Sequence, residues 1–393
     1  MRFRLFKKQI NVSIIAAGDI GQSMGAKLIE TLKAGGIDNI KSLALNSGKR
    51  HHETDKIYDQ VFSISDEIEG FARNLEIALE NVKNWKDKIR PLIGKMIPKN
   101  PGIMFLITGA GATGVSSILT VSEILKNSYR YSPPVIFVFP DRFENSRVHY
   151  NTAQFLYKTV FSEDPLGNNI LIVDNDPILE ENAWPFERIA KGKIDYVNRG
   201  VTNLLISSFY DPYRENYDAG YDDLYDTLYN PGLSFLIHVP FEDLIKEGGE
   251  GNLRYVDILV DQVIGRTAMT RDEVLDSRKV YCAIMRRSYE TIDLSYEAPR
   301  FLQSFENSPF LKLIKTGDEL KNDLGVAEPS LNAIVSGVEV YPRLIQAFKI
   351  ARDSRKAEIL AELDLEDEAV ELNIEKVESL EEKIEQLADL HNT

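Results

Sequence analysis

Two glycine-rich segments of this chain have a composition and a position suited to binding phosphate. The segment GDIGQSMG (18–25) follows the apolar run VSIIAA, and the segment GAGATG (109–114) follows the apolar run IMFLIT. Each then opens a pattern typical of a helix. Glycine lets backbone N–H groups approach a phosphate at the positive end of a helix dipole. Neither spacing is that of the dinucleotide fingerprint or of the P-loop, because no Gly-Lys-Ser/Thr follows.

Alternating strand-like and helix-like patterns predict the elements that must position these segments. Apolar runs predict strands at 12–18, 41–47, 103–109, 135–140, 170–176 and 204–210, and helical spacing predicts helices at 57–92, 115–128, 148–161 and 186–200. Strands buried on both faces with helices between them are typical of a doubly wound parallel sheet. Ligands bind such sheets at the carboxyl ends of the strands. Both glycine segments fall there, so two neighbouring loops can hold a polyphosphate from both sides.

The composition argues against several other classes of protein. A net charge of −15 over 393 residues disfavours binding to nucleic acid, since neutralising phosphates requires clustered Lys and Arg. Cys282 is the single cysteine, which rules out an intramolecular disulfide framework. No apolar run approaches the roughly 20 residues of a membrane-spanning helix, and the N-terminus lacks the apolar core of a secretory signal. We therefore expect a cytoplasmic protein.

The two ends of the chain differ in charge. Residues 354–393 contain 13 Asp and Glu against 4 Lys and Arg, which is a net charge of −9. Apolar residues recur there every three or four positions, which predicts an acidic amphipathic helix that packs on its own body or binds a partner. These apolar residues are Val370, Ile374, Val377, Leu380, Ile384 and Leu387. The basic arm 1–10 is expected to pack on the domain or to contact an anionic membrane surface or an adaptor protein.

The order of several short motifs resembles that of the tubulin/FtsZ superfamily. GDIGQSMG has the tubulin-like glycine spacing, and TGAGATG occupies the place of the signature GGGTGTG, with alanine at two of the glycine positions. Further similar motifs follow in the family's order within residues 10–245: LALNS, RNLEIA, FPDRFENSR, DNDPIL, NYDAGYDDL and NPGLSFLIHVPFEDL. The resemblance implies an α/β fold with a doubly wound parallel-sheet GTP-binding domain, a central helix and a smaller α+β domain.

The resemblance also implies a bound GTP or GDP, with Mg²⁺ accompanying the nucleotide and no metal held by the protein alone. The residues implied at the phosphates are Gly18, Asp19, Gly21 and Gln22 in the first loop and Gly109, Ala110, Gly111, Ala112, Thr113 and Gly114 in the second. The other implied contacts are Asn46 near the phosphates or ribose, Glu144 and Arg147 at the ribose and base, Tyr217 stacked on guanine, and Tyr221 with Asp222 at the base edge.

In this family the loop after the central helix reaches the nucleotide of the next subunit, and its acidic residues position the attacking water. The resemblance therefore implies head-to-tail self-assembly into protofilaments. Asp243 matches one of the two acids, Pro240 stands in place of the other, and His238 stands in place of an Asn. Glu242 is the candidate substitute. Because a water must be held by carboxylates at fixed places, slow GTP hydrolysis is expected.

The predicted parts of the chain are the basic arm, the nucleotide-binding domain, the central helix with the catalytic loop, the second α+β domain and the acidic tail. Their bounds are 1–10, 11–212, 213–258, 259–353 and 354–393. Two alternatives stay open. One is a nucleotide-binding scaffold or regulator without turnover. The other is an NADP-dependent oxidoreductase, in which Ser47, Lys49 and Arg50 would bind a 2′-phosphate.

Overall fold

In the computed structural model the described residues are 10–48, 53–65, 71, 73–141, 143–174, 193–209, 221–240, 279–285, 312–316, 330–338, 344–353 and 382. The basic arm up to residue 9 and nearly all of the acidic tail lie outside them, as do Tyr217, Glu242 and Asp243. No helix in the described part of the chain is both long enough and apolar enough to cross a membrane.

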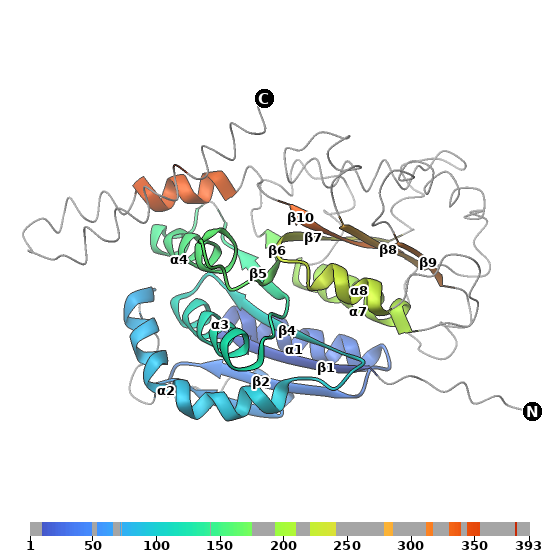
Figure 1. Cartoon of the computed structure of the whole chain (residues 1–393), viewed down its shortest axis with the longest axis horizontal. Coiled ribbons are helices and arrows are strands. Elements are labelled where there is room, and N and C mark those ends of the chain that lie inside the picture. The colour runs from blue at the N-terminus through green and yellow to red at the C-terminus, as the bar shows by residue number, and fades with distance from the viewer. Residues whose placement is uncertain are drawn as a thin grey trace, which may run out of the picture.

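A single sheet of ten strands runs through the molecule in the order β3-β2-β1-β4-β5-β6-β7-β10-β8-β9 (Figure 1). From β3 to β7 all neighbours are parallel, β10 is antiparallel to both β7 and β8, and β9 is parallel to β8. The strands are β1 (Asn11–Ala17), β2 (Ile40–Asn46), β3 (Gln60–Ser63), β4 (Gly102–Gly109), β5 (Val135–Phe139), β6 (Asn169–Asp174), β7 (Gly232–Pro240), β8 (Lys279–Met285), β9 (Lys312–Thr316) and β10 (Ser330–Val338). The predicted α/β fold with a mostly parallel sheet is confirmed.

Helices cover both faces of this sheet. One face packs against α2 (Leu75–Met96), α3 (Ala112–Ile124), α4 (Ser146–Leu156) and the helix over 344–353, and the other against α1 (Gly18–Ala34), α7 (Lys193–Phe209) and α8 (Tyr221–Leu228). Short helical turns also occur, namely η1 (Glu53–Ile57), η2 (Leu125–Tyr129) and η3 (Tyr157–Phe161). Successive β1 residues face opposite cores, with Ile15 in one and Ile14 in the other. Because both faces are buried, the strands are continuous apolar runs.

The predicted strand at 204–210 is wrong, whereas the five strands predicted before it are confirmed. The segment belongs to α7, which continues to Phe209. Its buried side chains Val197, Val201, Leu204 and Leu205 recur at helical spacing. Several polar residues of α7 are buried as well, so the helix is covered on much of its surface. A helix of this kind can carry a long apolar run, which resembles the pattern of a strand.

The helix that links the two parts of the sheet is α7, which ends before the segment 213–258 in which the sequence predicted the central helix. α7 packs against α1 on one side and against β7, β8 and β10 on the other. At Gly200, an added Cβ would lie 2.8 Å from the Leu236 side chain and 3.2 Å from Cβ of His238. A residue without a side chain therefore lets α7 lie close to β7. In the second part of the sheet, the apolar runs near 279–288 and 330–341 contain β8 and β10.

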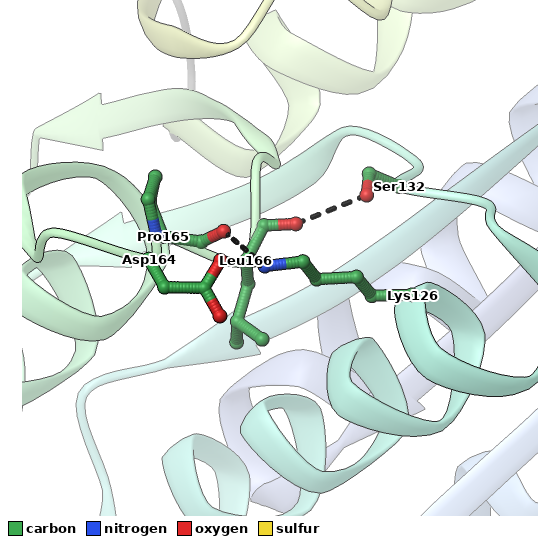
Figure 2. A network of polar contacts seen from close by, with 5 residues as sticks. All are labelled: Lys126, Ser132, Asp164, Pro165 and Leu166. Carbon is green, nitrogen blue, oxygen red and sulfur yellow. Dashed lines mark hydrogen bonds and ion pairs between the residues drawn. The ribbon is translucent and has the colours of Figure 1, made fainter.

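At the amino-terminal edge of the sheet, side chains tie the loop before β6 to the end of η2. Lys126 Nζ donates to Asp164 Oδ1 at 2.6 Å and to the Pro165 carbonyl at 2.8 Å, and Ser132 Oγ donates to the Leu166 carbonyl at 3.0 Å (Figure 2). Asp164 is almost fully exposed, so its ion pair with Lys126 stabilises the fold only weakly. The contacts to backbone carbonyls hold this loop beside β5 and β6.

Candidate functional site

Two helices begin at the carboxyl ends of the adjacent strands β1 and β4 without a side-chain cap. The N-cap residues of α1 and α3 are Ala17 and Gly111, neither of which has a polar side chain. In contrast, α2 and α4 are capped by Asn74 and Asn145, whose Oδ1 atoms accept a backbone N–H at 3.1 and 2.9 Å. A helix start that lacks a side-chain acceptor favours an anionic ligand.

The first and second glycine loops touch each other. Gly18 has a φ of +69°, and an added Cβ there would lie 3.1 Å from Cα and N of Gly114. A Cβ at Gly114 would in turn lie 3.0 Å from the Ala17 carbonyl, and one at Gly21 would lie 2.6 Å from the Ile107 carbonyl. These three glycines are therefore required by close backbone packing. As a result, the two helix starts face the same small volume.

Gly111 is the exception among the loop glycines. It is exposed, and nothing lies within 4 Å of an added Cβ. Packing therefore does not explain the missing side chain, whereas close approach of a ligand does. Ala110 and Ala112, which stand where the resembling family has glycine, bury their methyl groups in the core. These two substitutions leave the open side of the loop unchanged.

A polar network joins both glycine loops to the end of β2. Asn46 Nδ2 donates to Asp19 Oδ1 at 2.9 Å and to Gln22 Oε1 at 3.1 Å. Ser47 Oγ lies 3.1 Å from Thr113 Oγ1. Asp19 is exposed, whereas Gln22 is buried and accepts the hydrogen bond from Asn46 on the core side. The structure thus brings together the phosphate-facing residues predicted in both loops, with Gln22 in a supporting position.

Glu144 and Arg147 also lie at the carboxyl edge of the sheet, after β5. Glu144 is half-buried in a turn in which its N–H donates to the Asp141 carbonyl at 3.0 Å. Arg147 is exposed in the first turn of α4. Phe143, between β5 and α4, is 76% exposed. Both predicted residues are therefore placed next to the second glycine loop.

The structure does not bring Tyr221 and Asp222, which were predicted at the base edge, to the glycine loops. The Tyr221 hydroxyl donates to the Gly102 carbonyl at 2.8 Å and accepts from the Gly102 N–H at 3.0 Å. Gly102 begins β4, so Tyr221 lies at the amino-terminal edge, opposite the glycine loops. Asp222 is exposed in the first turn of α8 beside it. Tyr217, the predicted stacking residue, lies outside the described residues.

The segment after α8 forms a strand where the sequence indicated a loop that reaches a neighbour. His238 is only 3% exposed, and its Nδ1 lies 2.7 Å from Asn332 Oδ1 on β10. Pro240 ends β7 opposite Ser330. His238 is therefore a core residue of the sheet. The two acids predicted for catalysis, Asp243 and Glu242, follow β7 outside the described residues.

Three residues that sequence reasoning missed support the loops. Thr108 Oγ1 donates to the Gly109 carbonyl at 3.0 Å, Asn151 Nδ2 donates to the Ala110 carbonyl at 3.2 Å, and the Tyr58 hydroxyl donates to the Gln22 carbonyl at 2.5 Å. Thr108 stood inside an apolar run, and the other two are distant in sequence from the carbonyl they hold. No local signal could have found Asn151 or Tyr58.

Within the described part of the chain, no group of three or more His, Cys, Asp or Glu side chains is arranged to hold a metal ion. The exposed Asp19 carboxylate is the acidic group of the two glycine loops. A single carboxylate of this kind suits Mg²⁺ that is mostly bound by phosphate oxygens and water.

A parallel sheet with paired glycine loops at β1 and β4, continued by β7-β10-β8-β9, defines a fold of the tubulin and FtsZ type. Among similar solved structures is CetZ2 from Haloferax volcanii, titled a GTPγS-bound protofilament. It has a TM-score of 0.61 and 14% identity over 89% of this chain and 100% of that chain. An FtsZ mutant from M. jannaschii has a TM-score of 0.56 and 16% identity over 84% of this chain and 92% of that chain.

TubZ from Bacillus thuringiensis serovar israelensis, a GTPγS-form protofilament, gives a TM-score of 0.56 and 16% identity over 91% of this chain and 95% of that chain. No family model matches the chain, and none of the curated proteins matches its sequence. The likeness at these identities establishes the fold.

Proposed function

We propose that this chain is a cytoskeletal protein that binds a guanine nucleotide at the carboxyl edge of β1 and β4 and assembles head to tail. The observation that carries the proposal is the contact between two glycine loops whose helices, α1 and α3, both begin without a side-chain cap. Two converging helix starts supply backbone N–H groups and positive dipole ends on two sides of one volume. A nucleotide polyphosphate matches this arrangement.

Particular residues have defined roles in the proposed site. The backbone from Gly18 to Gly21 and from Gly111 to Thr113 binds the phosphates. Asn46 holds Asp19 in place through the 2.9 Å hydrogen bond. Because a carboxylate next to phosphate is repelled unless a cation lies between them, Asp19 is the residue that would face Mg²⁺.

The choice of guanine and of head-to-tail assembly is supported by the similar structures. The CetZ2 structure is a GTPγS-bound protofilament, and the TubZ structure is a GTPγS-form protofilament. In a head-to-tail polymer the carboxyl edge of one subunit meets a different surface of the next. The proposed partner is therefore a second copy of this chain.

Hydrolysis is proposed to be slow and to need this contact. Asp243, with Glu242, would orient a water for attack on the γ-phosphorus as the bond to the β-phosphate oxygen breaks. Pro240 supplies no carboxylate, and His238 is buried in β7, so neither can position water. Losing a positioning group typically lowers a rate by about 10²-fold.

A second candidate function is a nucleotide-binding scaffold without turnover. The burial of His238 against Asn332 favours it, because this part of the predicted catalytic loop is core. The two functions share the binding site and differ in turnover only.

The decisive experiment is to identify the nucleotide released from the denatured, freshly purified protein by chromatography, together with calorimetric titration of GTP, GDP, ATP and NADP. We expect GTP or GDP in the released fraction and tight binding of both. Binding of NADP without binding of GTP or GDP would overturn the proposal. In that case Ser47, which here lies against Thr113, would have to turn towards a 2′-phosphate.

A further inference from the structure

The outer side of α2 and the edge strand β3 form a surface that combines apolar and basic side chains. This α2–β3 surface consists of Phe62, Trp85, Lys88 and Lys95. Phe62 and Trp85 pack edge to face with ring centroids 5.7 Å apart, and Lys88 Nζ lies 3.9 Å from the centroid of the Trp85 ring. β3 is an outermost strand of the described sheet.

The α2–β3 surface carries positive charge that other described residues do not neutralise. Lys88 and Lys95 are seven residues apart, so they lie on one side of the helix. Lys41 on β2 joins them, since its Nζ donates to the Lys95 carbonyl at 2.8 Å. Within the described ranges, none of these three lysines has a carboxylate within ion-pair distance, whereas Lys86, towards α3, is paired with Glu123 at 3.1 Å.

The acidic tail has the complementary composition. Its net charge is −9 in a chain whose total is −15, and its apolar residues recur every three or four positions along 370–387. We infer that the segment 366–389 binds the α2–β3 surface of its own chain as an amphipathic helix. Its apolar side covers Phe62 and Trp85, and its carboxylates face the lysines. Such a cover also protects β3, whose exposed edge is otherwise a template for pairing with another strand.

The tail starts on the correct face and has the necessary length. The helix over 344–353 packs by Phe348 against Phe161, with ring centroids 6.4 Å apart, in the core shared with α2, α3 and α4. Figure 1 shows this helix (orange) beside α4, with α3 between α4 and α2. Three helix spacings of about 10 Å amount to about 30 Å. The residues 354–365 span up to about 40 Å when extended, so the tail reaches the surface without a second copy.

The test is carbodiimide cross-linking of the full chain, which joins lysine amines directly to carboxylates, followed by peptide mapping. We expect Lys88 and Lys95 to be joined to tail glutamates such as Glu375 and Glu378. The yield should fall several-fold at 0.5 M salt, on the order expected from screening. Lys27 and Lys33, exposed on α1 on the opposite face, are the internal control, and their yield with the tail should be at least tenfold lower.

Mixing ¹⁵N-labelled and unlabelled chains before cross-linking identifies which copy supplies the tail. Cross-linked peptides of uniform isotope content support binding within one chain, and mixed peptides overturn that part of the inference. Equal yields at the α1 lysines, or no tail cross-link to α2, overturn the assignment of the α2–β3 surface as the binding site of the tail.

A pair of charge-reversal variants gives an independent readout in the full chain. In Lys88→Glu/Lys95→Glu, amide hydrogen exchange across 366–389 should be at least tenfold faster than in the wild type. Lys27→Glu/Lys33→Glu changes the net charge equally on the opposite face and should leave that exchange unchanged. Unchanged exchange in the α2 variant would contradict the inference.

Discussion

At the scale of single residues, two loop glycines three positions apart lack a side chain for different reasons. Gly114 is held between the Thr108 side chain and the Ala17 carbonyl, so its hydrogen is a packing requirement. Gly111 faces open space and has an ordinary backbone conformation, with φ −68° and ψ 148°. This difference allows ligand binding to be separated from folding.

Gly111→Val should therefore fold almost normally and bind nucleotide poorly. Its unfolding free energy should change by about 1 kcal/mol or less, the usual effect of an N-cap substitution, while the affinity for GTP falls at least tenfold, about 1.4 kcal/mol. Gly114→Ala is the contrasting variant, because its methyl group overpacks the loop and should cost about 1–3 kcal/mol of stability. Urea denaturation and calorimetry measure both quantities. Unaltered GTP affinity in Gly111→Val would exclude Gly111 from the binding site.

Asn46→Asp should destabilise the site and make its stability depend on pH. The Nδ2 donor shared by Asp19 and Gln22 is lost, and a second carboxylate faces Asp19, so a cost of about 1–3 kcal/mol is expected. Two adjacent carboxylates resist ionising together, which raises one of their pKa values in the variant. Part of the loss should then be recovered between pH 7 and pH 5. Urea denaturation at both values checks this, and a loss independent of pH would contradict it.

At the scale of elements, α8 completes the backbone hydrogen bonding of β4. β5 pairs with β4 only from Leu106 onward, so among the described strands none pairs with the first residues of β4 on that side. Tyr221 bonds to the backbone of Gly102, and the Tyr229 hydroxyl accepts from the Met104 N–H at 3.2 Å. The Tyr229 hydroxyl also bonds to that of Tyr131. Tyr221 at the start of α8 and Tyr229 just after its end thus take the place of a strand.

This arrangement predicts a loss of stability in alkaline solution. Burial raises the pKa of Tyr131 and Tyr229 above the ordinary value near 10. The folded state therefore keeps protons that the unfolded chain releases, and their stabilisation, complete below pH 10, is lost as the pH rises further. In Tyr131→Phe/Tyr229→Phe the decline between pH 10 and 11 should be shallower by up to about 1 kcal/mol per pH unit for each tyrosine removed. Urea titrations across this range measure the slope, and equal slopes would contradict the assignment.

The elements also mark the extent of what could be predicted from the sequence. The parallel strands were predictable because burial on both faces produces uninterrupted apolar runs, as in Ile103–Ile107. The end of α7 was mistaken for a strand because LLISSFY is apolar, although Val197, Val201 and Leu204 already carried the helical spacing. β3 was lost inside a predicted helix because only Phe62 of its four residues packs against the core.

The site was predictable only where its residues are local in sequence. Gly18, Asn46 and Gly111 each end or follow a strand, which is a signal in the chain itself. Tyr221 was predicted at the base because a short motif resembled the start of a longer helix, whereas the structure directs its hydroxyl to the start of β4, at the other edge of the sheet. Contacts such as Asn151 to Ala110 depend on tertiary packing, which no spacing reveals.

At the scale of the whole molecule, the proposal predicts open-ended assembly. A head-to-tail contact joins different surfaces of two copies and does not close on itself. GTP or a slowly hydrolysed analogue should raise light scattering above a critical protein concentration, and negative-stain microscopy should show filaments. Gly111→Val provides the control with impaired nucleotide binding. A strict monomer at high concentration with GTP would contradict the proposal.

Turnover provides a separate prediction for Asp243. GTP hydrolysis per subunit should rise with protein concentration, since the proposed reaction needs the contact between two copies. Asp243→Ala should still bind GTP and assemble but hydrolyse it about 10²-fold more slowly. Phosphate release measured beside light scattering distinguishes the outcomes. An unchanged rate would exclude Asp243 from the reaction, and filaments without any hydrolysis in the wild type would favour the scaffold.

The pairing of β6 with β7 has a mechanical consequence. Asn169–Ile172 pair in parallel with Gly232–Phe235, and β7 pairs along its length with β10, so no gap interrupts the sheet. Turning one half against the other would shear hydrogen-bonded backbone, and a slip by one residue would turn every buried side chain of the strand to the opposite face. A pulling force applied at β9 is therefore transmitted through the hydrogen bonds of all ten described strands to β3. The sheet then deforms by bending as one continuous unit.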